Sequence, residues 1–462
     1  MKRLKQTIVA AATPPGRGGI SIVRLSGPLA RQIGQSLFKP SKAKNLAPWR
    51  LAHGFCTELD GRVLDEVLAV YMPAPKTYTG EDIFEIHCHG GPVVVSRLIE
   101  LCQQAGASLA RPGEFTLRAF LAGRIDLAQA EAVAELVQAR HQTAARLAAG
   151  HLAGALSKPC QKAAQTILEI LAELEAEVDF PEEDLEPSSR PQLVERLEEI
   201  IAELDGLIGQ AKAGECLREG ARVVLAGRPN VGKSSLLNAL LARPRALVTE
   251  IPGTTRDFLE EVLDLDGLPV LLTDTAGLRQ VGPGPESQIE AAGMAATRQM
   301  IGLAELVILV LDASQGFSLE DEALATAQPP DRLLVVANKA DLVSRKEADR
   351  VAAAFPGAAG LAVSAKTGLG LSQLKAAIRS RLIGPGPEPR ELTCLPSARQ
   401  TQALAGAKKA LEAAALGLKD GLAPEAAAVD LREGLEQIGL ITGQAAPDRL
   451  LEEIFNRFCI GK

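Results

Sequence analysis

Short apolar runs alternate with polar loops over the first 120 residues, and this pattern predicts a mixed α/β region. The runs have the length and β-branched content of strands and cover residues 7–12, 20–25, 63–71 and 83–89. Residues 92–105 begin with a proline that follows two glycines, which favours a helix start. We therefore expect an N-terminal α/β domain over residues 1–120.

Helical spacing replaces the strand pattern over residues 121–216. Apolar side chains recur there every three or four positions, as at Leu168, Leu171, Leu174 and Val178. An acidic segment with a proline at 179–184 separates two of the expected helices. The segment 384–462 begins with a linker rich in glycine and proline at 384–389 and then becomes helical again. We expect these two segments to form one helical domain.

Residues 217–383, which lie between the helical segments, alternate strand-like and helical patterns. The strand-like runs cover residues 222–226, 270–273, 306–311, 333–337 and 360–363. Such alternation indicates βαβ units and a mostly parallel sheet with buried strands. The expected fold class is thus a multidomain protein of α/β and all-α parts, in which one α/β domain is inserted into the helical domain.

Composition narrows the functional classes. The chain has 462 residues, of which 47% are apolar and 23% charged, so a disordered or fibrous protein is excluded. A net charge of −7 argues against a protein that coats nucleic acid through its overall charge. The seven cysteines form no CxxC pair and fit reduced thiols in a cytoplasm. The apolar runs are too short to span a membrane, so we expect a soluble, cytoplasmic protein.

The segment GRPNVGKS at residues 227–234 fits the P-loop pattern GxxxxGK[ST]. It follows an expected strand and precedes a helical run at 235–241, which is the context that the motif requires. Backbone N–H groups of such a loop point at phosphate oxygens. Lys233 would neutralise the β- and γ-phosphates, and the Ser234 hydroxyl would bind Mg²⁺.

Three further segments follow strands in the order found in GTP-binding proteins: DTAG at 274–277, NKAD at 338–341 and SAK at 364–366. The Asp341 carboxylate can accept hydrogen bonds from guanine N1–H and the exocyclic amine, a donor pair that adenine lacks. The motifs together predict GTP binding by a Ras-like P-loop GTPase domain. The predicted contacts are Asn230, Val231, Gly232, Lys233, Ser234, Ser235, Asp274, Thr275, Ala276, Gly277, Asn338, Lys339, Ala340, Asp341, Ser364, Ala365 and Lys366.

Leu278 stands where signalling GTPases carry the glutamine that orients the attacking water. An apolar side chain cannot polarise water. Catalytic help must therefore come from elsewhere, either from a carboxylate in the following loop, such as Glu286, or from an added cation.

Segments outside the nucleotide motifs carry a resemblance to a known family. They are ATPPGRGG at 12–19, YTGED at 78–82, RPGEF at 111–115, DLAQAE at 126–131, GTTRD at 253–257 and CIGK at 459–462. With these segments the whole chain resembles the MnmE (TrmE) family, tRNA modification GTPases of the TRAFAC class that modify the wobble uridine. The resemblance implies an N-terminal folate-binding and dimerising domain (1–120), a helical domain (121–216 and 384–462) and an inserted G domain (217–383).

The resemblance also implies ligands. Further GTP contacts are Thr249, Glu250, Ile251, Pro252, Gly253, Thr254 and Thr255. Potassium would be held by Asn230, Thr249, Ile251 and Thr254. Magnesium would be held by Ser234 and Thr255, and Glu286 would act on the attacking water. Folate, as 5-formyl- or 5,10-methylene-tetrahydrofolate, would contact Arg24, Glu81, Arg124 and Lys462, with the catalytic thiol of Cys459 near the transferred carbon. Arg124 replaces a lysine of the family, which keeps the charge.

The chain contains no GxGxxG dinucleotide fingerprint, so a partner must carry any flavin. The resemblance implies that this partner is MnmG (GidA), in a heterotetramer with a homodimer of this chain, and that tRNA is the substrate. The implied activity is potassium-dependent GTP hydrolysis that drives addition of an aminomethyl or carboxymethylaminomethyl group to C5 of the wobble uridine.

Two other functions remain open on the sequence. One is a ribosome-assembly GTPase, but residues 385–462 hold 9 Lys and Arg against 11 Asp and Glu, which disfavours the basic RNA-binding domain that such proteins append. The other is a folate-dependent carrier of one-carbon units whose G domain is only regulatory.

Overall fold

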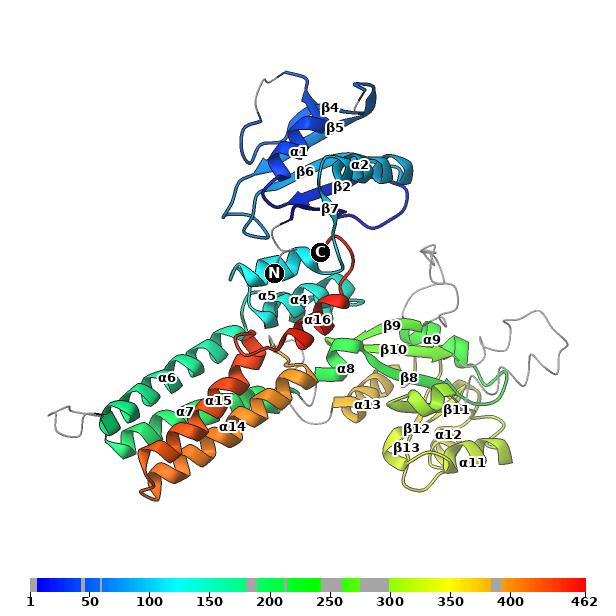
Figure 1. Ribbon diagram of the computed structural model, residues 1–462. Coiled ribbons are helices and arrows are strands. Elements are labelled where there is room, and N and C mark those ends of the chain that lie inside the picture. Colours follow the sequence, from blue (N-terminus) through cyan, green and yellow to red (C-terminus); the bar gives the residue numbers. More distant parts are fainter. Residues whose placement is uncertain are drawn as a thin grey trace. The chain divides into compact units, whose positions relative to one another are not determined.

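The computed structural model describes residues 6–42, 46–58, 60–179, 189–211, 214–241, 260–274, 299–383, 392 and 394–462. The chain divides into two compact units, shown as a ribbon in Figure 1. Unit 1 comprises residues 1–138, 148–205 and 402–462, and unit 2 comprises residues 139–147 and 206–401. The chain thus leaves unit 1 and later returns to it.

A seven-stranded sheet forms the first part of unit 1, with strand order β3-β4-β5-β6-β2-β1-β7. The strands are β1 (Ile8–Ala11), β2 (Gly18–Ser26), β3 (Phe38–Pro40), β4 (Ala52–Thr57), β5 (Val63–Met72), β6 (Ile83–Gly90) and β7 (Ser108–Leu109). Helices α1 (Ala30–Leu37) and α2 (Pro92–Gln104) pack on one face of the sheet over a core that includes Val9, Phe84 and Leu98. Helix α3 (Glu114–Leu121) contributes Phe115 to a smaller core with Ile8.

The rest of unit 1 is helical. Its elements are α4 (Leu127–Gln138), α5 (Gln142–Leu152), α6 (Ser157–Asp179), α7 (Arg190–Ala211), α14 (Ala398–Lys419), α15 (Pro424–Thr442) and α16 (Asp448–Asn456). The start of α5, the end of α7 and the start of α14 belong to unit 2. Helices α6 and α15 pack closely although they lie far apart in the sequence. The ion pairs Lys162–Glu203 and Lys419–Glu198, both 2.6 Å, join neighbouring helices on the exposed side. The two helical segments predicted from the sequence therefore pack together.

Unit 2 contains a six-stranded sheet of order β13-β12-β11-β8-β10-β9, in which β9 alone is antiparallel to its neighbour. The strands are β8 (Ala221–Ala226), β9 (Glu260–Leu265), β10 (Leu268–Asp274), β11 (Leu306–Asp312), β12 (Leu333–Asn338) and β13 (Ala359–Ala362). The other elements are α8 (Gly214–Glu219), α9 (Lys233–Leu241), α11 (Leu319–Thr326), η3 (Pro330–Arg332), η4 (Ala340–Leu342), α12 (Arg345–Ala352) and α13 (Leu371–Ile383).

Both faces of the sheet in unit 2 are buried, which explains why its strands are continuous apolar runs. Val223 and Ile308 pack with Leu236 of α9 and Leu374 of α13. Their neighbours in sequence, such as Val224, pack on the opposite face with residues of α11.

The expected fold class is confirmed, and each predicted strand is observed within two residues of its expected ends. The short or edge elements β3, β4, β7, β9, α1 and α3 were not predicted. Most of these elements are too short to establish a period, and in β9 acidic residues interrupt the apolar positions. The predicted linker at 384–389 lies outside the described residues. Within the described ranges, no helix combines the length and apolar composition needed to cross a bilayer.

Candidate functional site

The P-loop of unit 2 joins the buried strand β8 to the start of α9. Gly232 adopts a left-handed φ of 96°, and a Cβ atom there would lie 2.3 Å from Nδ2 of Asn338. Glycine is therefore required for the P-loop to pass this close to Asn338 of the NKAD motif. Lys233 is 5% exposed, and its Nζ donates hydrogen bonds to the carbonyl oxygens of Gly227 (2.9 Å) and Arg228 (2.8 Å). The P-loop thus curls around the ammonium group of Lys233.

Asn338 connects three of the predicted nucleotide motifs. Its Nδ2 donates to the carbonyl oxygen of Val231 at 3.0 Å, and its Oδ1 accepts from the backbone N–H of Ala365 at 3.0 Å. The neighbouring Lys339 has a left-handed φ of 62° and donates from Nζ to the carbonyl oxygen of Asn230 at 2.8 Å. These contacts hold the P-loop against the loops that follow β12 and β13.

The carboxylate expected to recognise guanine is held by a buried hydroxyl. Ser364 Oγ donates to Oδ1 of Asp341 at 2.6 Å. This hydrogen bond, aided by the charge of Lys366, lowers the pKa of Asp341 below its ordinary value. The second oxygen of the carboxylate has no protein partner in the described part of the chain, and Asp341 is exposed. An ionised carboxylate with a free oxygen is suited to accept from the paired donors of guanine.

Other predicted contacts fall outside the description. The DTAG motif begins at Asp274, which ends β10 beside β8, but nothing is described of the Asp274 side chain. Residues that lie outside the described ranges are Thr249, Glu250, Ile251, Pro252, Gly253, Thr254, Thr255, Thr275, Ala276, Gly277 and Glu286. Of the predicted potassium ligands only Asn230 is described, and of the magnesium ligands only Ser234.

The described residues fit a guanine nucleotide with its magnesium ion. The glycine at 232 leaves room beside Asn338 that a Cβ would fill, Lys233 supplies positive charge and Ser234 supplies a hydroxyl at the start of α9. The N-terminus of a helix favours the phosphate groups through its N–H groups and its dipole. Asp341 supplies the acceptor for the base, on the loop that follows β12.

A second cluster in unit 1 lies around α3 and the loop that precedes β6, and each of the four residues predicted to bind folate contacts one of these two segments. Arg24 on β2 lies opposite Glu85 on β6, and its Nε donates to Oε1 of Glu85 at 2.7 Å. The Arg24 guanidinium also lies over the Phe115 ring, 5.8 Å from its centroid. Burial disfavours the charged form of Glu85, but hydrogen bonds from His87 and Arg24 outweigh it and keep the pKa of Glu85 below its ordinary value.

Glu81 and Arg124 are each anchored by several contacts. Glu81 accepts hydrogen bonds from Ser26 Oγ at 2.7 Å and from Nη1 of the buried Arg118 at 2.9 Å. Arg124 donates to the carbonyl oxygen of Thr77, and its guanidinium lies 5.6 Å from the centroid of the Tyr78 ring. Both residues therefore sit beside the loop that precedes β6.

The C-terminal tail returns to the N-terminal sheet, as the family resemblance implies. The backbone N–H of Phe115 donates to the carbonyl oxygen of Lys462 at 3.2 Å. Gly461 has a left-handed φ of 97°, and a Cβ atom there would lie 2.1 Å from the carbonyl oxygen of Ala11, so only glycine fits. Cys459 is a free, exposed thiol. The four-residue tail thus packs on β1 and α3.

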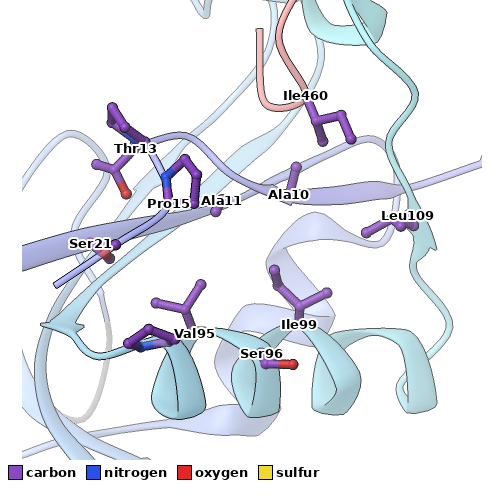
Figure 2. A pocket seen from close by; sticks show the side chains of 13 residues that line it. Ala10, Ala11, Thr13, Pro15, Ser21, Val95, Ser96, Ile99, Leu109 and Ile460 are labelled. Carbon is purple, nitrogen blue, oxygen red and sulfur yellow. The ribbon is translucent and has the colours of Figure 1, made fainter. Parts of the chain in front are cut away.

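The tail also forms one wall of an apolar cavity of about 430 Å³. Figure 2 shows Ile460 above β1, with Val95 and Ile99 of α2 on the opposite wall. None of the four predicted folate residues lines this cavity.

Several residues that hold these clusters were not singled out from the sequence. Asp312 at the end of β11 is buried and accepts from Nζ of Lys339 at 2.7 Å. Burial opposes its charge, but hydrogen bonds from Lys339 and Ser314 prevail and lower the pKa of Asp312. Arg118 joins Glu81 to Glu114. An aspartate directly after an apolar strand could have revealed Asp312, whereas Arg118 lies in a helix without a distinctive pattern.

Comparison with known proteins identifies the family. The family model described as GTP-binding protein TrmE N-terminus matches residues 7–124, and the model described as MnmE helical domain matches residues 127–459. A tRNA modification GTPase MnmE from Syntrophotalea carbinolica is 45% identical over 460 residues, which cover 99% of each chain. One from Symbiobacterium thermophilum is 44% identical over 462 residues, covering 99% of this chain and 100% of that protein.

Among solved structures, an Aquifex aeolicus Era variant bound to GDP.AlF4⁻ is 25% identical, covers 41% of this chain and 66% of that chain, and has a TM-score of 0.28. The full-length relatives and the two family models together assign the chain. It belongs to the MnmE family of tRNA modification GTPases and is a GTP hydrolase that acts in tRNA modification.

Proposed function

We propose that this GTPase works with the flavoprotein MnmG (GidA) to add an aminomethyl or carboxymethylaminomethyl group to C5 of the wobble uridine. Tetrahydrofolate, as its 5-formyl or 5,10-methylene form, supplies the one-carbon unit when bound. In this proposal residues 1–120 bind folate and form the homodimer, residues 121–216 and 384–462 form the helical domain, and residues 217–383 form the G domain. GTP hydrolysis drives the conformational cycle in the cytoplasm.

The observation that carries the folate proposal is the packing of the C-terminal tail against α3. Phe115 accepts the Arg24 guanidinium over its ring and donates its N–H to Lys462. Arg24, near the start of the chain, and Lys462, at its end, therefore both contact Phe115. Arg24, Arg124 and Lys462 provide cations for the carboxylates of folate, and Glu81 provides acceptors for a pterin ring.

Deleting residues 459–462 tests this proposal. We expect wobble-uridine modification, measured by mass spectrometry with MnmG and a tetrahydrofolate present, to fall by about 100-fold or more, since the deletion removes both Lys462 and the Cys459 thiol. GTP hydrolysis should change less than twofold because the tail lies in unit 1. Cys459→Ser alone should reproduce most of the loss. Normal modification by the truncated chain would overturn the role of the tail.

The potassium proposal rests on Asn230. Its φ of 64° is left-handed, its side chain is exposed, and within the described ranges its amide makes no hydrogen bond. The side-chain oxygen is therefore available to a monovalent cation beside the phosphates, where positive charge stabilises the charge that develops during hydrolysis. Thr249, Ile251 and Thr254 complete the proposed ligand set, with Thr255 and Ser234 on magnesium and Glu286 on the attacking water.

GTP hydrolysis rates in potassium and in sodium test this part. We expect hydrolysis at least about tenfold faster in potassium, because one developing charge loses a stabilising contact in sodium. Asn230→Ala should abolish the preference and leave GTP affinity within about threefold of the parent value. Equal rates in the two salts for the unchanged protein would contradict the proposal.

A further inference from the structure

A polar cavity of about 510 Å³ lies in the helical part of unit 1, apart from the apolar cavity beside the tail. Its walls come from the end of α3, the starts of α4 and α6, and the segment after α15. The cations Arg124 and Lys158 and the amides of Gln129, Gln161 and Gln444 line it. These side chains can bind a ligand that carries both negative charge and hydrogen-bonding groups.

Ser157 gives independent support for a ligand in this cavity. It is 2% exposed and lines the wall, and its hydroxyl has no hydrogen-bond partner in the described part of the chain. A buried hydroxyl without a partner destabilises the fold, and native proteins rarely leave one unsatisfied. Lys158 and Gln444 likewise have no ion pair or side-chain hydrogen bond among the described residues. Lys158 and Gln444 are exposed, so their polar ends are available to a bound molecule, whereas Ser157 Oγ is buried in the wall and is reached only if the wall shifts on binding.

The carboxylate in the wall is already committed to the fold. Asp126 Oδ1 accepts from the N–H of Gln129 at 2.8 Å, and Gln129 Oε1 accepts from the N–H of Asp126 at 3.0 Å. Gln129 also donates from Nε2 to the carbonyl oxygen of Leu152 at 3.0 Å. These bonds cap the start of α4 and fix α5 beside it. The DLAQAE segment, which the nucleotide chemistry leaves unexplained, thus builds this wall and leaves the cations to face a ligand.

Arg124 links the cavity to the predicted folate cluster. Its guanidinium lies over the Tyr78 ring, and the Tyr78 hydroxyl is hydrogen-bonded to Thr116 at 2.9 Å. Helix α3 carries Phe115 in the folate cluster and Phe120 in the cavity wall. At 1.5 Å per residue these two positions are about 7–8 Å apart along the helix. A ligand extending from the first site can therefore reach the second.

We propose that this cavity binds the γ-linked glutamyl tail of a polyglutamylated tetrahydrofolate, an inference that rests on the proposed folate function. Each added glutamyl residue carries one carboxylate and one amide N–H. Lys158 and Arg124 match the carboxylates, and the oxygens of Ser157, Gln161 and Gln444 match the amides. A nucleic-acid backbone would offer phosphates but no N–H donors, so the mixed lining favours the glutamyl chain.

The binding of 5-formyl-tetrahydrofolate to the full chain, as its mono- and triglutamate, tests the proposal by isothermal titration calorimetry. We expect the triglutamate to bind about tenfold more tightly, as one or two charge-assisted contacts would give. Lys158→Ala should remove most of this preference while leaving monoglutamate affinity unchanged. The matched control is Lys162→Ala, one turn further along α6, whose ammonium pairs with Glu203 at 2.6 Å. It should keep the full preference.

Ser157→Ala separates ligand binding from a structural role. Removing an unpartnered buried hydroxyl should not lower the melting temperature, but it should weaken triglutamate binding by about threefold or more. If neither folate binds, the folate part of the proposed function fails, and this inference with it. If the monoglutamate binds and the triglutamate binds no better, only this inference fails. A preference that survives Lys158→Ala, or a loss of tRNA binding in its place, would also overturn it.

Discussion

In unit 2 the candidate nucleotide residues come from loops that follow neighbouring parallel strands, whereas in unit 1 the candidate folate residues come from four distant parts of the chain. The P-loop follows β8, and the loops with Asn338 and Ser364 follow β12 and β13. Arg24 lies on strand β2, Glu81 in the loop before β6, Arg124 in the turn after α3 and Lys462 in the tail. In the mostly parallel sheet of unit 2 the strand order places the candidate residues at one edge, whereas in the mostly antiparallel sheet of unit 1 their placement depends on contacts between segments far apart in sequence.

The two sites also hold their charged groups differently. Lys233 donates to backbone carbonyls of the P-loop, and Lys339 donates to one such carbonyl and to Asp312. The backbone carbonyls remain in place when a neighbouring side chain is substituted. Arg24 and Glu81 instead rely on the side chains of Glu85 and Arg118. Removal of one supporting charge should therefore damage the site in unit 1 more than the site in unit 2.

Arg118→Ala should give the largest effect. The guanidinium is 3% exposed and pairs with Glu81 and Glu114, both at 2.9 Å, so its loss leaves a buried carboxylate without its countercharge. Breaking a buried ion pair in this way lowers the free energy of unfolding by about 3–5 kcal/mol. Trp49 is the single tryptophan of the chain and lies beside the same sheet, bonded to Tyr71, so its fluorescence in urea reports this unfolding.

Arg62→Ala is the matched control for that measurement. Its partner Asp60 is exposed, so the loss of this pair should leave the free energy of unfolding almost unchanged. Equal destabilisation by the two substitutions would show that the unit 1 cluster does not depend on its buried charge.

Asp341→Asn should have the next largest effect, on nucleotide choice rather than on folding. The amide places an N–H₂ group where guanine offers donors, so GTP affinity should fall about 100-fold, the loss of two hydrogen bonds to a charged acceptor. The affinity for xanthosine triphosphate should increase, because its C2 oxygen can accept a hydrogen bond from the side-chain amide that the substitution introduces. Equilibrium binding of both nucleotides measures this, with the exposed Asp349→Asn on α12 as control. Unchanged GTP affinity would contradict the role of Asp341.

The same contrast explains what could be predicted from the sequence. The strands of unit 2 are continuous apolar runs that end in motifs, so both the fold and the nucleotide residues could be located from local pattern. The tail in unit 1 could be assigned only through the family resemblance. Nothing local in the sequence predicts that Lys462 meets Phe115, because the contact depends on how the chain returns after α16.

Supporting residues were missed in both units for a common reason. Arg118 and Asp312 act on other side chains rather than on a ligand, so no motif marks them. The edge strand β9 was missed because three of its six positions are acidic and break the alternation expected of a strand. Burial and pairing, which decide these roles, are properties of the folded chain.

Asp312→Asn should give the smallest of these effects and sharpens the comparison on the nucleotide side. Oδ2 of Asp312 holds Nζ of Lys339, which also bonds to the backbone of Asn230 in the P-loop. The hydrogen bond to the Asn230 backbone survives the substitution. We therefore expect the free energy of unfolding to fall by only about 1–2 kcal/mol, the value of one charged hydrogen bond beside a partly exposed lysine. Hydrogen exchange of β11 amides measures it, and the exposed Asp331→Asn, at the entry to β12, is the control.

The dependence of this effect on pH follows from the lowered pKa of Asp312. A carboxyl whose pKa is lower in the folded than in the unfolded chain stabilises the fold above its unfolded pKa of about 3.9, and the contribution disappears as the pH falls through the folded pKa. The difference between parent and Asp312→Asn should therefore be full at pH 7 and shrink progressively below about pH 4. A difference that stays constant down to the acid limit would show that Asp312 acts through its shape and hydrogen bonds rather than through its charge.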